Sequence, residues 1–268
     1  LGALNAFNAY QPKFVEVPTD NGGLIPEELD KILETTPNCK FIYVIPDFQN
    51  PTGRTWSMER RQKFMEVVNK HNLPVLEDNP YGELRYEGTI LPSLKSMDTK
   101  GLVMFLGTFS KIFCPGLRLG WIAAEHSLLS EFVKIKQSAD LHTSNFDQGV
   151  ADAYMEQYDL DEHVKEIVAL YKHRRDLILE SMEKYFPAGT EWTHPEGGLF
   201  LWLTFPEGVS ARKVFNKCIE MKVAGVIGDA FYPNQKTDRS MRINYSNMPD
   251  DRIVEGIQRM AKAIKECM

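Results

Sequence analysis

Short runs of apolar residues alternate with helix-like stretches along the first half of the chain. Five β-rich runs are strand candidates: FVEV (14–17), FIYVIP (41–46), PVLED (74–78), VMFLGT (103–108) and LGWIAA (119–124). Several are apolar nearly throughout, as strands are when helices cover both faces of their sheet. Residues 26–33 and 57–71, which lie between them, have the apolar spacing of helices. This alternation predicts an α/β fold with a mainly parallel sheet and helices on both of its faces.

The pattern changes after residue 125. Residues 127–158 and 160–185 each read as one long helix. Strand-like EWTHP (191–195), GLFLWLTF (198–205) and SMRINYS (240–246) follow, with helices predicted over 210–222 and 250–266. This looser order predicts a smaller C-terminal α+β domain. We expect a large domain over residues 1–145 and the small domain over 146–268.

Composition and charge argue against several classes of protein. The net charge is −6, so no strong positive field would attract nucleic acid to this segment. The four cysteines lie far apart and the six histidines lack metal-ligand spacing. We therefore expect no disulfide framework and no metal site, and a reducing, cytoplasmic location fits best. No apolar run approaches the ~18 residues of a membrane helix, so no membrane partner is expected.

Polar side chains stand at the ends of three predicted strands. Asn50 lies in the Asn-Pro-Thr-Gly turn after the first, and Asp78 and Tyr81 stand at the end of the second. The third is followed by hydroxyl, amine and guanidinium groups, those of Thr108, Ser110, Lys111 and Arg118. Taken alone, each segment could be a turn, a structural carboxylate or a solvated lysine. Ligands of open α/β sheets bind outside the carboxyl ends of the strands, so the joint arrangement predicts a binding site.

These segments carry a resemblance to a known family. FQNPTG (48–53), EDNPYGELRY (77–86) and TFSKIFCPGLRLGW (108–121) are similar to the pyridoxal-phosphate (PLP) aminotransferases of fold type I. The subgroup that they resemble most holds 2-aminoadipate, kynurenine and aromatic amino-acid aminotransferases. PEGGLFLW (195–202), GDAFYP (228–233) and SMRINYSN (240–247) extend the likeness to the end of the chain. The resemblance implies a PLP-transferase fold type I with PLP as cofactor.

The resemblance also implies a role for each residue at the strand ends. Lys111 would hold PLP as a Schiff base and would then move the proton between the substrate Cα and the cofactor. Asp78 would pair with the pyridine nitrogen and keep it protonated. Tyr81 and Asn50 would hydrogen-bond the phenolic oxygen of the cofactor. Its phosphate would be bound by the hydroxyl groups and guanidinium of Thr108, Ser110 and Arg118.

Arg242 completes the expected site. It alternates with Met241 and Ile243 in a predicted strand, so its side chain points to the opposite face from theirs. By resemblance, Arg242 would bind the substrate α-carboxylate with help from Asn50, a task suited to the planar guanidinium. A lone arginine on a strand is otherwise most often a surface residue.

The resemblance covers roughly the last two-thirds of a typical family member. We therefore expect the printed residues to belong to a longer chain whose N-terminal part completes the large domain and the PLP site. Thr108 stands where many relatives have serine, and the hydroxyl is retained. Family members complete each site with residues of a partner subunit, so the resemblance also implies a homodimer.

The resemblance implies a transaminase that moves an amino group between an α-amino acid and a 2-oxo acid. Two alternatives remain open at this point. One is another PLP reaction on the same scaffold, such as that of a β-lyase or a decarboxylase, because function depends on the site and not on the fold. The other is the aminotransferase-like effector domain of a transcription regulator, with a DNA-binding domain before residue 1. The Asp47-Phe48-Gln49 segment before Asn50 resembles the enzymes more than the regulators.

Overall fold

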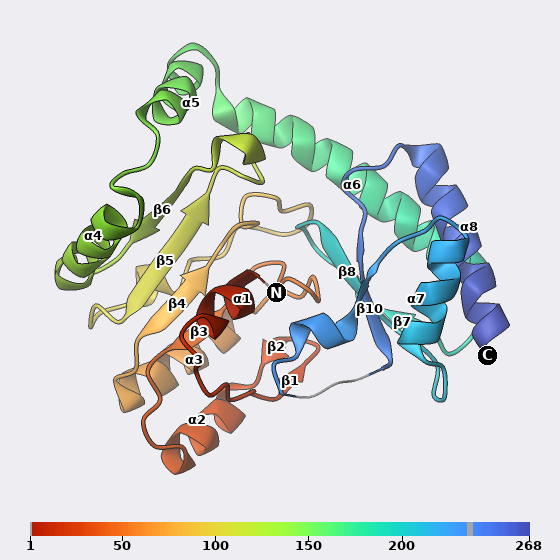
Figure 1. Ribbon diagram of the computed structural model, residues 1–268, viewed down its shortest axis with the longest axis horizontal. Helices are drawn as coiled ribbons and strands as arrows, with labels where there is room; N and C mark the ends of the chain where they lie inside the picture. The colour runs from red at the N-terminus through yellow and green to blue at the C-terminus, as the bar shows by residue number, and fades with distance from the viewer. Residues whose placement is uncertain (1, 235–237) are drawn as a thin grey trace.

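Two four-stranded sheets, one in each half of the molecule, organise the chain (Figure 1). The computed structural model describes residues 2–234 and 238–268. The helices are α1 (Gly2–Asn8), α2 (Pro26–Thr35), α3 (Met58–His71), α4 (His126–Asp140), α5 (Asn145–Gln157), α6 (Leu160–Tyr185), α7 (Ala211–Glu220) and α8 (Asp250–Cys267). The strands are β1 (Thr19–Asp20), β2 (Gly23–Leu24), β3 (Ile42–Val44), β4 (Val75–Asp78), β5 (Val103–Thr108), β6 (Gly120–Ala123), β7 (Glu191–Trp192), β8 (Phe200–Thr204), β9 (Val226–Ile227) and β10 (Ser240–Asn244).

The first sheet has the order β3-β4-β5-β6. Its first three strands are parallel and β6 is antiparallel to β5, so the predicted mainly parallel sheet is confirmed. Helices α2 and α3 cover one face, where Phe64 and Val68 of α3 pack with Ile42 and Val75 in one apolar cluster. Tyr43 points to the other face, against α1 and the N-terminal half of α6. Both faces are therefore covered, which explains why these strands are apolar nearly throughout.

The second sheet has the order β7-β8-β10-β9 and is antiparallel in every pairing. Helix α8 packs against α6 and α7 beside it. Leu201 and Leu203 of β8 and Met241 and Ile243 of β10 lie in the core between the sheet and these helices. The C-terminal half thus has the predicted α+β character.

Two of the predicted elements are wrong. Residues 14–17 form no strand; Asn234 instead donates hydrogen bonds to the Phe14 carbonyl (3.0 Å) and the Glu16 carboxylate (3.0 Å). Residues 127–158 form two helices and not one. The chain turns at Leu141, whose φ of +68° is incompatible with a helix, and the Ser144 side chain caps the N-terminus of α5. The apolar spacing did not reveal this break because it continues across the turn.

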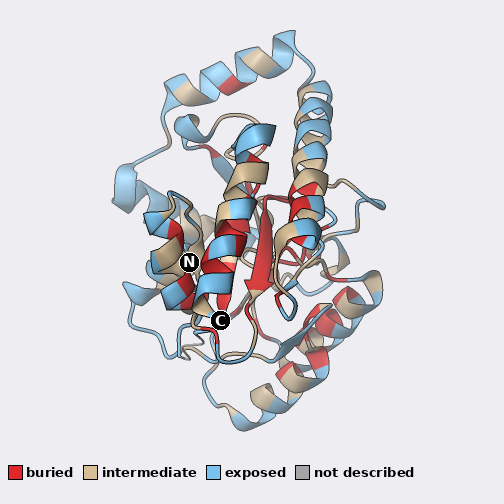
Figure 2. Cartoon of the chain, turned by 90° about the vertical axis from the view of Figure 1, so that its right-hand side faces the viewer, coloured by how far each residue is buried: buried red, intermediate tan, exposed pale blue. Residues whose placement is uncertain are grey.

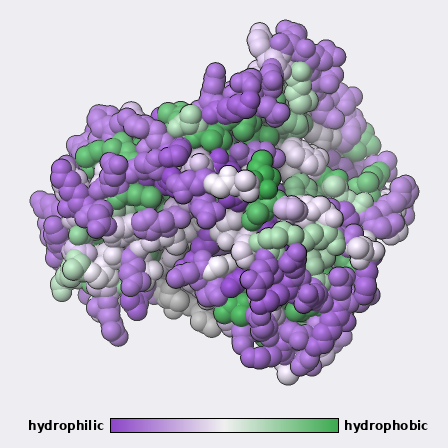
Figure 3. Space-filling view, turned by 180° about the vertical axis from the view of Figure 1, so that it is seen from behind, coloured by the Kyte–Doolittle hydropathy of each residue, from purple (hydrophilic) through white to green (hydrophobic). Residues whose placement is uncertain are grey.

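Helix α6 crosses between the two halves along the top of the molecule (Figure 1). Its first half packs on a cluster that joins β3 to the start of β8, and its second half packs on the core of the C-terminal half. Buried residues gather on the strands and on the inner sides of the helices (Figure 2). Seen from behind, the surface is mainly hydrophilic with scattered hydrophobic areas (Figure 3). Within the described residues, none of the helices has the length and apolar character needed to cross a membrane.

Candidate active site

The parallel strands β3, β4 and β5 end at the same edge of their sheet. The segments that follow them contain Asn50, then Tyr81, then the turn over residues 109–113. Ile112 of this turn packs in one apolar cluster with Tyr81 and Phe200. The three strand ends thus surround a common region, as the sequence pattern predicts.

The Asn-Pro-Thr-Gly turn fits closely against the start of β8. Gly53 has a φ of +69°, and a Cβ at this position would lie 2.5 Å from the Phe200 carbonyl oxygen. Only glycine is compatible with both conditions. The side chains of Thr52 and Gln49 are joined within the turn by a 2.6 Å hydrogen bond. These contacts hold Asn50 at the boundary between the two halves.

Arg242 reaches Asn50 from the opposite half of the molecule. Its Nη1 donates a 2.7 Å hydrogen bond to Asn50 Oδ1, and its guanidinium lies over the rings of Phe200 (4.1 Å) and Phe231 (5.1 Å). Met241 and Ile243 point into the core on the other face of β10. Burial lowers the pKa of Arg242, and its buried Nε has no hydrogen-bond partner among the described residues.

Tyr81 is joined to this pair through Asn50. The side chain of Asn50 lies beside the Tyr81 phenol, and its carbonyl oxygen accepts a hydrogen bond from Arg242. Burial, followed by the nearby carboxylate of Asp78, raises the pKa of Tyr81 to about 12, so this phenol is protonated at neutral pH. Asn50, Tyr81, Asp78 and Arg242 are therefore brought together as one group.

Asp78, the last residue of β4, is half-buried and accepts a 2.6 Å hydrogen bond from the Tyr43 hydroxyl at Oδ2. Burial raises the pKa of Asp78, and the Tyr43 hydrogen bond acts in the opposite direction. The sequence analysis did not single out Tyr43, and it treated Phe200 as a core residue only. Strand alternation could have placed Tyr43 on the face of Asp78, but only once the neighbouring strands and their register were known.

The turn after β5 is organised by the Thr108 hydroxyl. This oxygen accepts a hydrogen bond from the Ser110 backbone N–H (3.1 Å) and lies 3.0 Å from both the Leu119 carbonyl oxygen and the Ser110 hydroxyl. The turn presents Lys111, which is half-buried and whose amine forms no hydrogen bond or ion pair with any described residue. Thr108 and Ser110 are thus in direct contact, and Lys111 follows them with an amine that no described residue engages.

Arg118 is the candidate residue that the structure leaves apart. It is exposed, has a left-handed φ of +57°, and donates a 2.9 Å hydrogen bond to the Pro115 carbonyl. The next residue, Leu119, connects Arg118 to the other candidate residues, because its carbonyl oxygen accepts a hydrogen bond from the Thr108 hydroxyl.

Comparison with known proteins agrees with this arrangement. The family model for aminotransferase class I and II matches residues 3–260. The chain belongs to the class I and II aminotransferases. An aromatic-amino-acid aminotransferase of Thermococcus litoralis is 43% identical over the whole chain, which spans 65% of that relative's length. The crystal structure of a Pyrococcus horikoshii kynurenine aminotransferase in complex with PMP superposes with a TM-score of 0.95 at 41% identity, covering 98% of this chain and 66% of that one. The fold is that of the fold type I aminotransferases.

Transcription regulators are also among the relatives of this aminotransferase chain. An uncharacterised HTH-type transcriptional regulator of Bacillus subtilis is 30% identical over 229 residues, which cover 85% of the chain and 47% of the regulator. The match is lower in identity and shorter than that to the Thermococcus enzyme.

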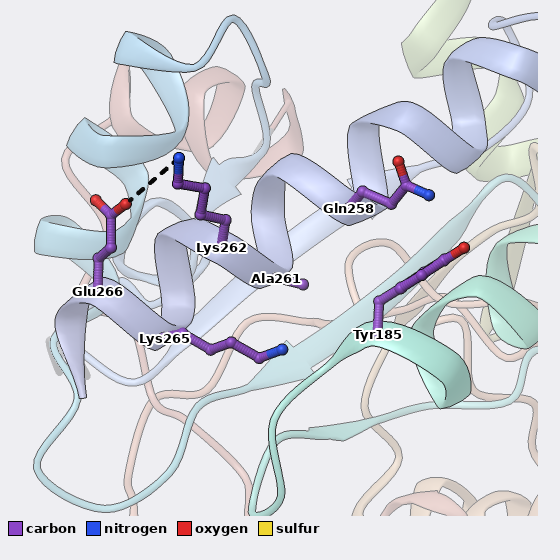
Figure 4. A pocket seen from close by; sticks show the side chains of 6 residues that line it. All are labelled: Tyr185, Gln258, Ala261, Lys262, Lys265 and Glu266. Carbon is purple, nitrogen blue, oxygen red and sulfur yellow. Dashed lines mark ion pairs between the residues drawn. The ribbon is translucent and has the colours of Figure 1, made fainter.

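An open hollow lies in the C-terminal half of the molecule, between the end of α6 and α8 (Figure 4). It is lined by Tyr185, Gln258, Ala261, Lys262, Lys265 and Glu266. Lys262 and Glu266 form a 3.9 Å ion pair there, as the dashed line shows. None of the candidate site residues lines this hollow.

Proposed function

We propose that this chain provides most of the active site of a PLP-dependent aminotransferase, which moves an amino group from an α-amino acid to a 2-oxo acid. The observation that carries the proposal is the hydrogen bond from Arg242 to Asn50, which lies beside Tyr81, because it joins a carboxylate-binding group to the strand ends. The Thermococcus and Pyrococcus relatives are named as aminotransferases, which supports the same activity.

Three polar groups with unfilled hydrogen-bonding capacity support PLP as the cofactor. The Lys111 amine has no partner, Asp78 accepts only the Tyr43 hydrogen bond, and Arg242 Nε is buried without a partner, all among the described residues. A cofactor with an aldehyde and a protonated ring nitrogen would satisfy Lys111 and Asp78. The carboxylate of a bound substrate would satisfy Arg242. The PMP in the Pyrococcus structure is the amino form of this cofactor, which adds support.

Bound PLP supplies an aldehyde that takes up the amino group and a ring that accepts electrons from the substrate Cα. Lys111 would bond covalently to the cofactor and, once released, take and return the proton at Cα. Asp78 would accept a hydrogen bond from the ring nitrogen and hold its proton. The protonated Tyr81 would donate to the cofactor's phenolic oxygen, with Asn50 beside it. Each of these tasks requires the group to be fixed before the substrate arrives.

Ser110, Thr108 and Arg118 would bind the phosphate. The Ser110 backbone N–H is already engaged by Thr108, so Ser110 would donate through its hydroxyl. Thr108 would turn its one proton away from the Leu119 carbonyl and Ser110 hydroxyl, and Arg118 would leave the Pro115 carbonyl. The guanidinium of Arg242 would bind the α-carboxylate that donor and acceptor share.

We further propose a homodimer in the cytoplasm. Large apolar side chains are exposed on α4 and α5, among them Ile135 and Phe146, of which 59% and 79% are accessible. Exposed apolar patches of this kind are typical of subunit interfaces. The cysteines are free in the described residues and widely spaced, which supports a reducing compartment.

Absorption spectra and a panel of amino donors test the proposed activity. The full-length protein with PLP should absorb in the visible and convert an amino acid and a 2-oxo acid into the exchanged pair. Cofactor binding without amino transfer, accompanied by salt-dependent DNA binding, would favour the regulator instead. Release of ammonia or carbon dioxide in place of amino transfer would favour a β-lyase or a decarboxylase.

A further inference from the structure

Tyr43 is a half-buried tyrosine at the candidate site that has no role in the reaction proposed above. Its hydroxyl donates a 2.6 Å hydrogen bond to Asp78 Oδ2. No other hydrogen bond joins this hydroxyl to a described residue. It comes from β3, the strand that neighbours the one ending in Asp78.

The register of the two parallel strands brings Tyr43 and Asp78 together. Tyr43 is paired with Leu76, and Asp78 lies two residues beyond Leu76 in β4. Residues two apart in a strand share a face, so Leu76 and Asp78 lie on the same face as Tyr43. The long phenol side chain spans the remaining distance to the carboxylate at the strand end. Glu77, between Leu76 and Asp78, points to the opposite face.

The ring of Tyr43 is held on two sides. Phe7 of α1 makes an edge contact with it at a centroid distance of 5.7 Å, and the ring packs against the apolar cluster that includes Tyr81 and Phe200. A ring held in this way presents its hydroxyl in one direction. The hydrogen bond to Asp78 therefore fixes the orientation of the carboxylate as well as satisfying it.

A half-buried carboxylate needs such a donor to stay ionised. Burial raises the pKa of Asp78, and the hydrogen bond from Tyr43 opposes this rise. Among the described residues, the titratable side chains that interact with Asp78 are Tyr43 from β3 and Tyr81 from the segment after β4, and burial raises the pKa of both phenols, so both remain neutral. Tyr43 is thus the side chain that stabilises the charge of Asp78 by direct donation.

We propose that Tyr43 is a positioning residue, which holds Asp78 Oδ2 so that the other carboxylate oxygen faces the ring nitrogen of the cofactor. This inference rests on the proposed function, since it assigns the pyridine nitrogen as the partner of Asp78. Tyr43 acts through Asp78 and does not itself touch the cofactor.

The test compares Tyr43→Phe, Asp78→Asn and the double variant in the full-length protein. In Tyr43→Phe, the Asp78 carboxyl, observed by carbon NMR in the cofactor-free protein, should titrate at a higher pH than in the unaltered protein. The PLP dissociation constant should rise about tenfold, the size expected for one hydrogen bond to a charged group. In the Asp78→Asn background, removal of the Tyr43 hydroxyl should not weaken PLP further. In the holoenzyme, kcat should fall more than KM changes.

Tyr245→Phe is the matched control. It removes a phenol oxygen that is buried and lies 3.2 and 3.1 Å from the Gly197 and Gly198 carbonyl oxygens, away from Asp78. It should leave the Asp78 titration unchanged. An unaltered Asp78 titration in Tyr43→Phe would overturn the proposal, and so would a loss of PLP affinity that is equally large in the Asp78→Asn background. If the unaltered enzyme transaminates and Tyr43→Phe matches it, this inference alone fails, whereas an unaltered protein that binds no PLP contradicts the proposed function itself.

Discussion

At the scale of single residues, the two acidic side chains at the end of β4 show how position selects a role. Glu77 points to one face, where it accepts 2.8 Å hydrogen bonds from the backbone N–H groups of Leu94 and Lys95. Asp78 points to the other face, where it accepts one hydrogen bond from Tyr43 and keeps further acceptor capacity. Burial raises the pKa of both carboxyls. The structure thus satisfies Glu77 completely and leaves Asp78 ready for another donor.

The first prediction concerns Lys111, whose amine has no partner among the described residues. Lys111→Ala should abolish both turnover and the protein-linked adduct that borohydride traps with PLP, because no other amine would form the covalent bond. Mass spectrometry of the reduced protein measures the adduct. Lys31→Ala, which removes an exposed amine paired with Glu28 on α2, is the control and should retain both properties. An undiminished adduct in Lys111→Ala would show that another lysine holds the cofactor.

The second prediction concerns Arg242. Arg242→Lys keeps the positive charge but loses the planar pair of donors. The transition-state stabilisation calculated from kcat/KM should therefore fall by about 2 to 3 kcal/mol, the order of a hydrogen bond to a charged group. The loss should be similar for every amino donor, since all share the α-carboxylate, and PLP binding should persist. Steady-state kinetics with several donors measure it. A loss confined to one donor would make Arg242 a side-chain selector.

At the scale of elements, buried polar pairs fix the segments that leave the strands. Asp47, just after β3, accepts a 2.6 Å hydrogen bond from Arg61 of α3, and the Arg61 side chain is fully buried. Arg61 also donates to the carbonyl groups of Trp56 and Pro92. Arg85 approaches the same Asp47 oxygen at 3.5 Å and pairs with Glu196 from the segment before β8. This network ties the turn that carries Asn50 to a helix and to the opposite half.

The third prediction follows from this network. Asp47→Ala would leave the Arg61 charge buried without its counter-ion, so the free energy of unfolding should fall by about 3 to 5 kcal/mol. Urea denaturation of the full-length protein measures the change. Glu59→Ala, which removes an exposed partner of Lys63 on the same helix, should change stability by less than about 0.5 kcal/mol. Equal stability of the Asp47 and Glu59 variants would mean that the buried pair contributes nothing.

The fourth prediction concerns Asp98, which stands before β5. Burial disfavours its charge, but the backbone N–H groups of Val103, Leu102 and Lys100 and the Lys95 amine outweigh this and hold the pKa of Asp98 below its usual value of 3.8. The contribution to stability is therefore present above pH 3.8 and is lost as the pH falls through the lower folded-state pKa. Asp98→Asn should destabilise the protein by about 1 to 3 kcal/mol at neutral pH.

Unfolding measured from neutral pH down to pH values below the ordinary pKa of Asp98 tests this sign. The difference between the unaltered protein and Asp98→Asn should shrink as the pH falls. A difference that stays constant over this range would show that charge at Asp98 does not stabilise the connection to β5.

At the scale of the whole molecule, the two halves are joined by α6, by the apolar cluster at the strand ends and by the bridge from Arg242 to Asn50. The fifth prediction is that the active enzyme is a homodimer, because two-fold dimers are the commonest closed assembly and α4 and α5 expose large apolar side chains. Light scattering of the active full-length protein should give twice the subunit mass. A fully active monomer would contradict this.

The pattern of residues along the chain was enough to predict the fold class, most elements and the candidate residues. The apolar runs of β3, β4 and β5 predicted a buried parallel sheet because a strand covered on both faces needs apolar residues throughout. The strand-end positions of Asn50, Asp78 and Lys111 followed from chain order alone. The break at Leu141 and the absence of a strand at 14–17 could not be predicted, because apolar spacing does not record a left-handed residue or a missing partner strand.

Which of these residues meet depends on the tertiary structure. Asn50 and Arg242 are 192 positions apart, and their contact depends on how β10 lies against the turn after β3. Tyr43 and Asp78 meet because two strands adopt one particular parallel register, which a local pattern leaves undetermined. Phe200 has the alternation of a core residue, and its second role beside Arg242 arises from packing between the halves. Local sequence determines which way a side chain points from its own element, whereas its partner depends on the packing of elements far apart in the chain.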